Sequence, residues 1–305
     1  MHERKPPDLA AFALMIVLCA TWGFQQVTIK LASEGISPVL QSGLRSAIAL
    51  LLLALWARWR GLVLTRADGT LRNGLLAGFL FAVEFVFIYL GLSFTTASRM
   101  IVVLYTAPCL TVLGLHFFVP GEQMRWRHFA GVGLAFAGII LGFAGESGAP
   151  PGAWIGDLLG LLAAFGWAAT TVLIRATELA RISASKVLFY QLAVSAALML
   201  PLSPLIGETG VSSLSVPILL ALAYQGVIVA FASYLTWFWL LTRYLTARLS
   251  VFSFLTPLFG VACGVLFLGD RLTPSFVAAV ACVTSGIVLV NLPVQRETRR
   301  ADRSQ

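Results

Sequence analysis

The chain has 305 residues, of which 59% are hydrophobic and 11% charged, with a mean hydropathy of +0.90 and a formal net charge of +8. Soluble domains carry about 25% charged residues, so this composition excludes a soluble globular protein and indicates an integral membrane protein. The positive charge gives no reason to expect a nucleic-acid partner, because basic residues gather in the cytoplasmic loops of membrane proteins.

The apolar runs predict membrane-spanning helices. Several reach the length of about 20 residues that a helix needs to cross a bilayer. The shorter alternating pattern of an outer-membrane barrel is absent. Breaks at Pro, Gly and charged clusters divide the chain into ten predicted spans. They cover residues 9–29, 36–57, 73–92, 97–118, 128–145, 153–174, 186–206, 215–241, 246–268 and 273–292.

The distribution of basic residues predicts the orientation. With the N-terminus in the cytoplasm, seventeen Lys and Arg residues fall in inside segments, and only Lys30, Arg99 and Arg271 fall outside. Arg45 lies within a span. This asymmetry indicates that both termini are cytoplasmic and that the number of crossings is even. We therefore expect a multi-pass protein of the cell inner membrane, with the lipid bilayer as its surroundings.

Two stretches of the chain are similar to each other. Residues 96–110, TASRMIVVLYTAPCL, align with residues 245–259, LTARLSVFSFLTPLF, so that Arg99 falls on Arg248. The similarity predicts a duplicated five-helix unit, with a first repeat at 9–145, a linker at 146–152, a second repeat at 153–293 and a basic cytoplasmic tail at 294–305. Because five is odd, the second repeat enters the membrane from the opposite side. The predicted fold is thus an all-α membrane protein of ten transmembrane helices in two inverted-topology repeats, an architecture typical of secondary transporters.

The same segments carry a resemblance to a known family. ATWGFQQ (20–26) in the first helix has a counterpart in FGWAATT (165–171), the second helix contains an Arg, the fourth and ninth contain Pro, and an acid follows each of these two. This ordered set resembles the EamA branch of the drug/metabolite transporter (DMT) superfamily. The resemblance implies a ten-helix exporter of small metabolites, often amino acids. In that family helices one to four and six to nine surround a central cavity, and helices five and ten lie outside.

Arg45 and Glu84 are two charges at similar depth. Arg45 lies about 13 Å below the outer end of its span, and Glu84 lies about 12 Å below the same surface on the next helix. A lone charge near the middle of the bilayer costs at least about 2.5 kcal/mol, so we expect the two to pair. A pair that faces a cavity could hold a substrate carboxylate on Arg45. A permanent ion pair that only joins the two helices is the alternative, and the sequence leaves both open.

Further polar and aromatic residues inside the spans complete the predicted substrate site. Gln191 lies in the second repeat at about the position of Arg45 in the first, and Trp167 is likewise equivalent to Trp22. Amide and indole groups lose hydrogen bonds in hydrocarbon, so several should turn inward. The candidate substrate-binding residues are Trp22, Gln26, Arg45, Glu84, Tyr105, Trp167, Gln191 and Tyr234.

Two prolines at the centres of predicted helices are candidate gates. Pro108 and Pro257 occupy equivalent positions in the two repeats. A proline inside a helix removes a backbone hydrogen bond and bends the helix. A bend in equivalent helices suits a pair of gates, although a fixed kink is an equal alternative.

Other functions find little support. The catalytic motifs of hydrolases, zinc proteases and nucleotide-binding enzymes are absent, and no cluster has the spacing of metal ligands, so we expect neither an enzyme nor a bound metal or cofactor. The sequence predicts a secondary active transporter that exports amino acids or similar small metabolites by alternating access. An efflux transporter for drugs or organic cations is the alternative. Proton coupling, the direction of transport and a homodimer stay open.

Overall fold

The structure is a computed structural model that describes residues 8–120, 124–144, 150–244 and 251–291. This part of the chain is helical and contains no named strand, only an isolated bridge between Ile36 and Val211. The prediction of an all-α protein is confirmed for it. In chain order the elements are α1 (Leu9–Ala32), α2 (Pro38–Trp59), α3 (Leu71–Gly91), α4 (Ala97–Leu104), α5 (Ala107–Phe118), α6 (Trp126–Ala144), α7 (Ala153–Ala176), η1 (Glu178–Arg181), α8 (Ala184–Leu205), α9 (Val216–Ala223), η2 (Tyr224–Ser233), α10 (Tyr234–Arg243), η3 (Val251–Phe254), α12 (Leu255–Leu268) and α13 (Pro274–Asn291).

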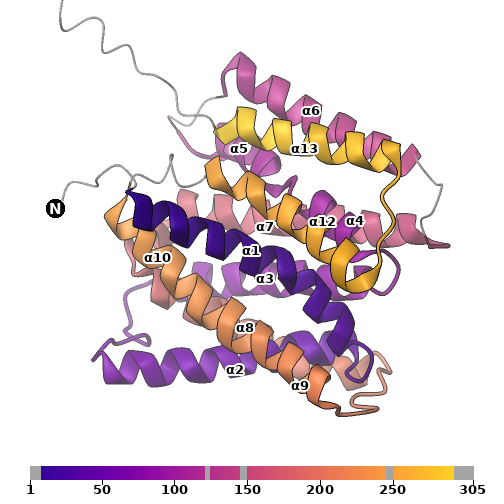
Figure 1. The fold of residues 1–305 in the computed structure, drawn as a ribbon. Coiled ribbons are helices and arrows are strands. Elements are labelled where there is room, and N and C mark those ends of the chain that lie inside the picture. The colour runs from indigo at the N-terminus through magenta and orange to yellow at the C-terminus, as the bar shows by residue number, and fades with distance from the viewer. Residues whose placement is uncertain (1–7, 121–123, 145–149, 245–250, 292–305) are drawn as a thin grey trace, which may run out of the picture.

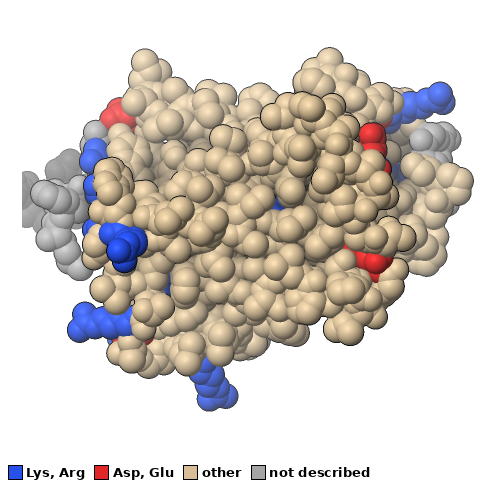
Figure 2. All heavy atoms as spheres, turned by 90° about the horizontal axis from the view of Figure 1, so that it is seen from below, with Lys and Arg blue, Asp and Glu red and all other residues tan. Residues whose placement is uncertain are grey.

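Apolar helices dominate the chain. Seven helical segments of the described part are long and apolar enough to cross a membrane, and three shorter apolar helices cover residues 126–141, 255–268 and 274–290. Figure 2 shows one face of the molecule with uncharged residues across most of its middle and charged side chains gathered toward its two ends. A bilayer requires this distribution, because charged groups are costly in its core and favourable at its surfaces.

Contacts between distant segments hold the bundle together. The most extensive contacts of α1, α2, α3 and α6 are made with α12, α8, α7 and α13, all from the later part of the chain. In Figure 1, α6 and α13 lie along one edge of the molecule and α2 and α8 near the opposite edge. The first half of the chain is therefore packed against the second half through most of the bundle, and the interior lies between them.

Glycines allow the two peripheral helices α6 and α13 to approach each other closely. A Cβ at Gly138 would lie 2.8 Å from the carbonyl oxygen of Ala279, and one at Gly131 would lie 2.9 Å from that of Gly286. Such contacts are closer than any side chain allows, so these glycines bring the two backbones together. Cys282 and Val283 of α13 complete the contact at Gly138.

The predicted helix at 97–118 is interrupted in the structure. α4 ends at Leu104 and α5 begins at Ala107, and the amide of Thr106 donates to the carbonyl of Val103 at 3.1 Å, a bond that tightens the last turn. Pro108 lies in the first turn of α5, where its missing N–H costs no helical hydrogen bond. Pro257 is likewise the third residue of α12, which follows the short helix η3. Both candidate gate prolines therefore stand at the start of a helix and not inside one.

The predicted helix at 215–241 contains a second irregularity. Between α9 and α10 the chain continues as a ten-residue π-helix, η2, from Tyr224 to Ser233. π-helical turns are rare and are found frequently at functional sites. Tyr234, a candidate site residue, follows directly after this segment.

Some predicted features lie outside the described residues. The basic tail at 294–305 is outside entirely, as are most of the linker at 146–152, the first residues of the predicted ninth span and Arg248.

Candidate functional site

A cavity of about 480 Å³ lies within the bundle. Its wall combines residues of α1, α3, α4, α5 and α7 with residues of α8, α10 and η3, so both halves of the chain contribute. The lining is mostly apolar and aromatic, with a small number of amide, hydroxyl and carboxylate groups. This combination is typical of small-molecule sites, where polar groups orient a ligand inside an apolar pocket.

The structure brings together seven of the eight residues that the sequence predicts at the substrate site. Those on the cavity wall are Trp22, Gln26, Glu84, Tyr105, Trp167, Gln191 and Tyr234. The eighth, Arg45, lies outside the wall and has an exposed fraction of 0%. Of the two prolines, Pro108 lines the cavity, whereas Pro257 is buried away from it.

Aromatic pairs join the two halves of the chain across the cavity wall. Trp22 meets Trp237 edge to face with 6.0 Å between ring centroids, and Tyr105 meets Trp167 in the same way at 5.3 Å. The indole nitrogen of Trp22 donates a hydrogen bond of 2.9 Å to the hydroxyl of Ser233 in the π-helix η2. Both pairs thus have fixed positions, and their rings offer π surfaces to a bound molecule.

Arg45 is buried behind the wall. Its guanidinium carbon lies 4.0 Å from the ring centroid of Phe85, and its Nη2 donates to the Tyr234 hydroxyl at 3.4 Å. Phe85 and Tyr234 both line the cavity, so these two side chains separate Arg45 from its interior. Among the residues that the structure describes, the Nε and Nη1 atoms of Arg45 have no hydrogen-bond partner.

The expected ion pair between Arg45 and Glu84 is not formed. Arg45 does lie beside this part of α3, but its guanidinium stacks on Phe85 and makes no hydrogen bond or ion pair with Glu84. Neighbouring residues of a helix point about 100° apart, because 3.6 residues make one turn. Phe85 therefore faces Arg45 while Glu84 faces the cavity.

A buried ion pair elsewhere in the bundle was missed by the sequence analysis. The guanidinium of Arg99 in α4 pairs with the carboxylate of Asp157 in α7, which has an exposed fraction of 1%. The hydroxyl of Thr95 donates to the same carboxylate at 2.9 Å. The available signal was an acid inside the apolar run 153–176, but nothing local in the sequence connects Asp157 with Arg99.

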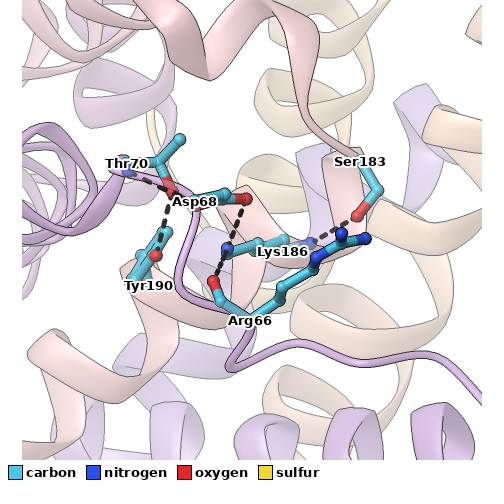
Figure 3. Close-up of polar contacts among 6 residues, drawn as sticks. All are labelled: Arg66, Asp68, Thr70, Ser183, Lys186 and Tyr190. Atoms are coloured by element: carbon cyan, nitrogen blue, oxygen red, sulfur yellow. Dashed lines mark hydrogen bonds and ion pairs between the residues drawn. The ribbon is translucent and has the colours of Figure 1, made fainter.

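A second polar cluster joins the loop after α2 to the start of α8 (Figure 3). The ammonium of Lys186 donates to the Asp68 carboxylate at 2.7 Å and to the Arg66 carbonyl at 2.6 Å. The hydroxyl of Thr70 donates to Asp68 at 2.6 Å. The bond from Lys186, followed by that from Thr70, lowers the pKa of the Asp68 carboxyl to about 2.

The opposite loop makes a corresponding contact. The carboxylate of Glu208, in the loop after α8, accepts hydrogen bonds from the backbone amides of Val39 and Leu40 at 2.9 and 3.1 Å. These amides lie in the first turn of α2, where a negative charge is favourable. Each of the two helices α2 and α8 is thus held at its start by an acid from the loop that follows the other.

The cavity extends toward one end of the molecule. Met15 in the early part of α1 and Ile174 near the end of α7 both lie on its wall, together with Leu115 near the end of α5. Figure 1 shows that α1 begins and α7 ends on the same side of the bundle, the side on which the N-terminus lies. The Arg99–Asp157 pair lies at the start of α7, toward the other end.

The sequence matches a known family twice. The family model described as "EamA-like transporter family" matches residues 9–143 and 154–292. A solved crystal structure has a TM-score of 0.67 with this chain at 21% identity, and the alignment covers 93% of this chain and 98% of the other. That likeness concerns the fold.

Relatives of similar length support the same family. A "Probable amino-acid metabolite efflux pump" of Salmonella typhimurium strain LT2 is 24% identical, over 90% of this chain and 93% of the relative. A protein of the same description from Escherichia coli K12 is 25% identical, over 89% and 91%. An "Uncharacterized transporter" of Archaeoglobus fulgidus is 26% identical, over 88% and 91%. With two family matches and a bundle of apolar helices, this chain belongs to the EamA-like transporter family and is a multi-pass membrane transporter, not an enzyme.

Proposed function

We propose that the protein is a secondary active transporter that exports amino acids or similar small metabolites across the inner membrane by alternating access. The observation that carries this proposal is the cavity of about 480 Å³ between the two halves of the chain, lined by residues of both and extending toward one end. A site between two halves can be exposed to either side of the membrane when the halves rock against each other.

The helix pairings support an inverted repeat of ten helices. In such a repeat α1 corresponds to α7, and α4 with α5 corresponds to α12. The contact of α1 with α12 therefore has its counterpart in the contact of α7 with α4 and α5, and both are present. The pairs α2 with α8 and α6 with α13 map onto themselves. The separate family matches at 9–143 and 154–292 agree with this symmetry. With both termini in the cytoplasm, as the basic residues predict, the cavity extends toward the cytoplasm.

The relatives and the residues of the cavity wall support the proposed substrate class. Two relatives carry the description of amino-acid metabolite efflux pumps, and the wall combines amide, hydroxyl and carboxylate groups with aromatic rings. Arg45 is proposed to hold a substrate carboxylate in a conformation in which Phe85 or Tyr234 turns away. Pro108 and Pro257, each at the start of a helix, are proposed to allow α5 to bend relative to α4, and α12 relative to η3, during the cycle.

One observation favours the second candidate, an efflux transporter for organic cations. Glu84 is the sole Asp, Glu, Lys, Arg or His among the described residues that line the cavity. A carboxylate with aromatic neighbours also suits a cation without any carboxylate. The two candidates differ in whether Arg45 takes part.

Flux through liposomes distinguishes these functions. Purified protein is reconstituted, and uptake of labelled phenylalanine, threonine and tetraphenylphosphonium is measured with and without a pH gradient. We expect saturable phenylalanine uptake that is accelerated by unlabelled phenylalanine on the opposite side. Uptake of tetraphenylphosphonium alone would favour the second candidate. Absence of saturable uptake of all three, relative to protein-free liposomes, would contradict the proposal.

Proton coupling and the role of Arg45 are read from the same assay. Stimulation of phenylalanine flux by an imposed pH gradient would support proton coupling, and its absence would indicate exchange or facilitated diffusion. The variant Arg45→Ala is expected to lose phenylalanine flux, because the carboxylate loses its partner. The exposed Arg271→Ala is the matched control and is expected to transport like the parent.

A further inference from the structure

Resting on the proposed transport function, we infer that Glu84 is the receptor for a protonated amine, so that the cavity selects molecules with an ammonium group on an apolar body. The amine, and not the carboxylate, is then the group recognised in the conformation that the structure represents. The inference bears on both candidate functions, because amino acids carry such a group and so do those cationic drugs that are amines.

The position of Glu84 is the first support. It lies near the middle of α3 with an exposed fraction of 6%, and it lines the cavity. It makes no hydrogen bond or ion pair with the residues that the structure describes. On its other side, a Cβ at Gly166 of α7 would lie 3.1 Å from the Glu84 Cβ and 3.3 Å from its Cα. The close backbone of α7 therefore fixes the base of this side chain at the wall.

The charge balance is the second support. A buried carboxylate without a partner is unfavourable and requires a cation or a proton. Arg45 forms no hydrogen bond or ion pair with Glu84, because its guanidinium contacts Phe85 and Tyr234 behind the wall. The described lining contains no Lys, Arg or His. A protonated amine bound in the cavity would supply the missing positive charge.

The neighbours of Glu84 are the third support. Tyr105 and Tyr234 line the same cavity as Glu84. Aromatic faces attract ammonium groups and accept apolar bodies. Gln26 is on the same wall, and its buried Oε1 has no hydrogen-bond partner in the described part of the chain. It offers a second acceptor to an ammonium, which has three N–H donors.

Four probes of one shape test the inference. They are L-phenylalanine, phenethylamine without the carboxylate, 3-phenylpropanoate without the amine and 2-phenylethanol without either charge. Binding to the full chain in detergent is followed by tryptophan fluorescence, since Trp22, Trp167 and Trp237 lie on the wall. We expect both amines to bind at least about tenfold more tightly than the acid and the alcohol, the effect of one charge-assisted hydrogen bond.

Variants assign the preference to Glu84. In Glu84→Gln the amines should bind no more tightly than 2-phenylethanol, while Glu84→Asp keeps the preference at reduced affinity. The same chemical change at an exposed position, Glu34→Gln, is the control and should leave all four affinities unchanged. Thermal unfolding of each variant shows whether it is folded. If Glu84→Gln does not fold, the binding of the four probes to the parent still tests the amine preference.

Three outcomes overturn the inference. The first is equal binding of phenethylamine and 2-phenylethanol, which is expected if the Glu84 carboxyl stays protonated. The second is an amine preference that survives in Glu84→Gln, and the third is no binding of any probe to the parent. Flux in liposomes is measured separately. Amine-selective binding without flux would contradict the transport function and leave the role of Glu84 in place. Flux without amine preference would contradict this role alone.

Discussion

Arg45 and Glu84 lie on facing helices at the same level of the bundle, yet Glu84 faces the cavity and Arg45 is shielded from it. The guanidinium carbon of Arg45 lies 4.0 Å from the ring centroid of Phe85, the residue next to Glu84. The two charges therefore have different surroundings. The Glu84 carboxylate lines the cavity, and the Arg45 guanidinium contacts the Phe85 ring and the Tyr234 hydroxyl. Under the proposed function, this separation would give a zwitterionic substrate two places to bind in sequence.

Removal of the Phe85 ring should open Arg45 to the cavity. In Phe85→Ala the shield is lost, so 3-phenylpropanoate, which we expect to bind the parent weakly, should bind at least about tenfold more tightly through the guanidinium. Tryptophan fluorescence measures this gain.

The matched control is Phe81→Ala, which removes another ring of the wall, 4.7 Å from Phe85. It should not create acid binding, because the ring on which the Arg45 guanidinium stacks is that of Phe85 and stays in place. An equal gain in both variants would show that cavity volume, and not access to Arg45, determines acid binding.

The Arg99–Asp157 pair is expected to stabilise the end of the bundle opposite the N-terminus. Removing one partner leaves a buried charge, which typically costs about 3 kcal/mol or more. Asp157→Ala should therefore lower the unfolding temperature in detergent markedly. Arg271→Ala, which removes an exposed arginine, should change stability by less than about 0.5 kcal/mol. A double variant Arg99→Leu/Asp157→Leu that recovers most of the stability would confirm that the loss came from the unpaired charge.

The Asp68–Lys186 bond should make stability depend on pH in the acid range. The pKa of Asp68 is lowered from its ordinary value of 3.8 to about 2, so folding is favoured by the ionised form. Its contribution is complete above pH 3.8 and is lost as the pH falls through the lowered pKa. The difference in unfolding temperature between the parent and Asp68→Asn should be constant above about pH 5 and should close toward pH 2. Glu34→Gln removes an exposed carboxylate as the control and should show no such closure.

Close packing of α6 on α13 should depend on Gly138. Gly138→Ala places a methyl group 2.8 Å from the Ala279 carbonyl oxygen, so the helices must separate, at a cost of about 1–3 kcal/mol. Gly133 lies on the same helix with nothing within 4 Å of an added Cβ. Gly133→Ala should be neutral or stabilising by up to about 1 kcal/mol through helix propensity. Thermal unfolding of the pair measures the difference, and equal effects would show that the contact is not important.

The sequence predicted where the helices lie better than which way their side chains face. Hydrophobic length decides where a membrane helix begins and ends, so most predicted spans agree with the helices to within about three residues. The rotation of a helix depends on contacts with segments far along the chain. Phe85 and Glu84 are neighbours in α3 but point about 100° apart, so Phe85 contacts Arg45 and Glu84 does not. The pairing of Arg99 with Asp157 also depends on contacts between segments far apart in the chain, and no local sequence pattern predicts it.

Helix breaks were predicted in kind but not in position. Proline chemistry indicated a bend near Pro108, and the structure places the break two residues earlier, at Thr106, because proline is best accommodated in the first turn of a helix. The π-helix at 224–233 has no proline or glycine pair that marks it, and the apolar pattern of the region fits an ordinary helix equally well. Its link to the site became evident only from the hydrogen bond that its last residue, Ser233, accepts from Trp22.

Side-dependent access to the cavity is the most direct test of alternating access. Cys19, Cys109, Cys263 and Cys282 are replaced by alanine, and one cysteine is placed at Gln191 on the wall. A membrane-impermeant thiol reagent is then added from either side of oriented vesicles, with and without phenylalanine. We expect labelling from the cytoplasmic side in the absence of phenylalanine, and a changed balance between the two sides in its presence. Equal labelling from both sides under both conditions would contradict alternating access and indicate an open channel.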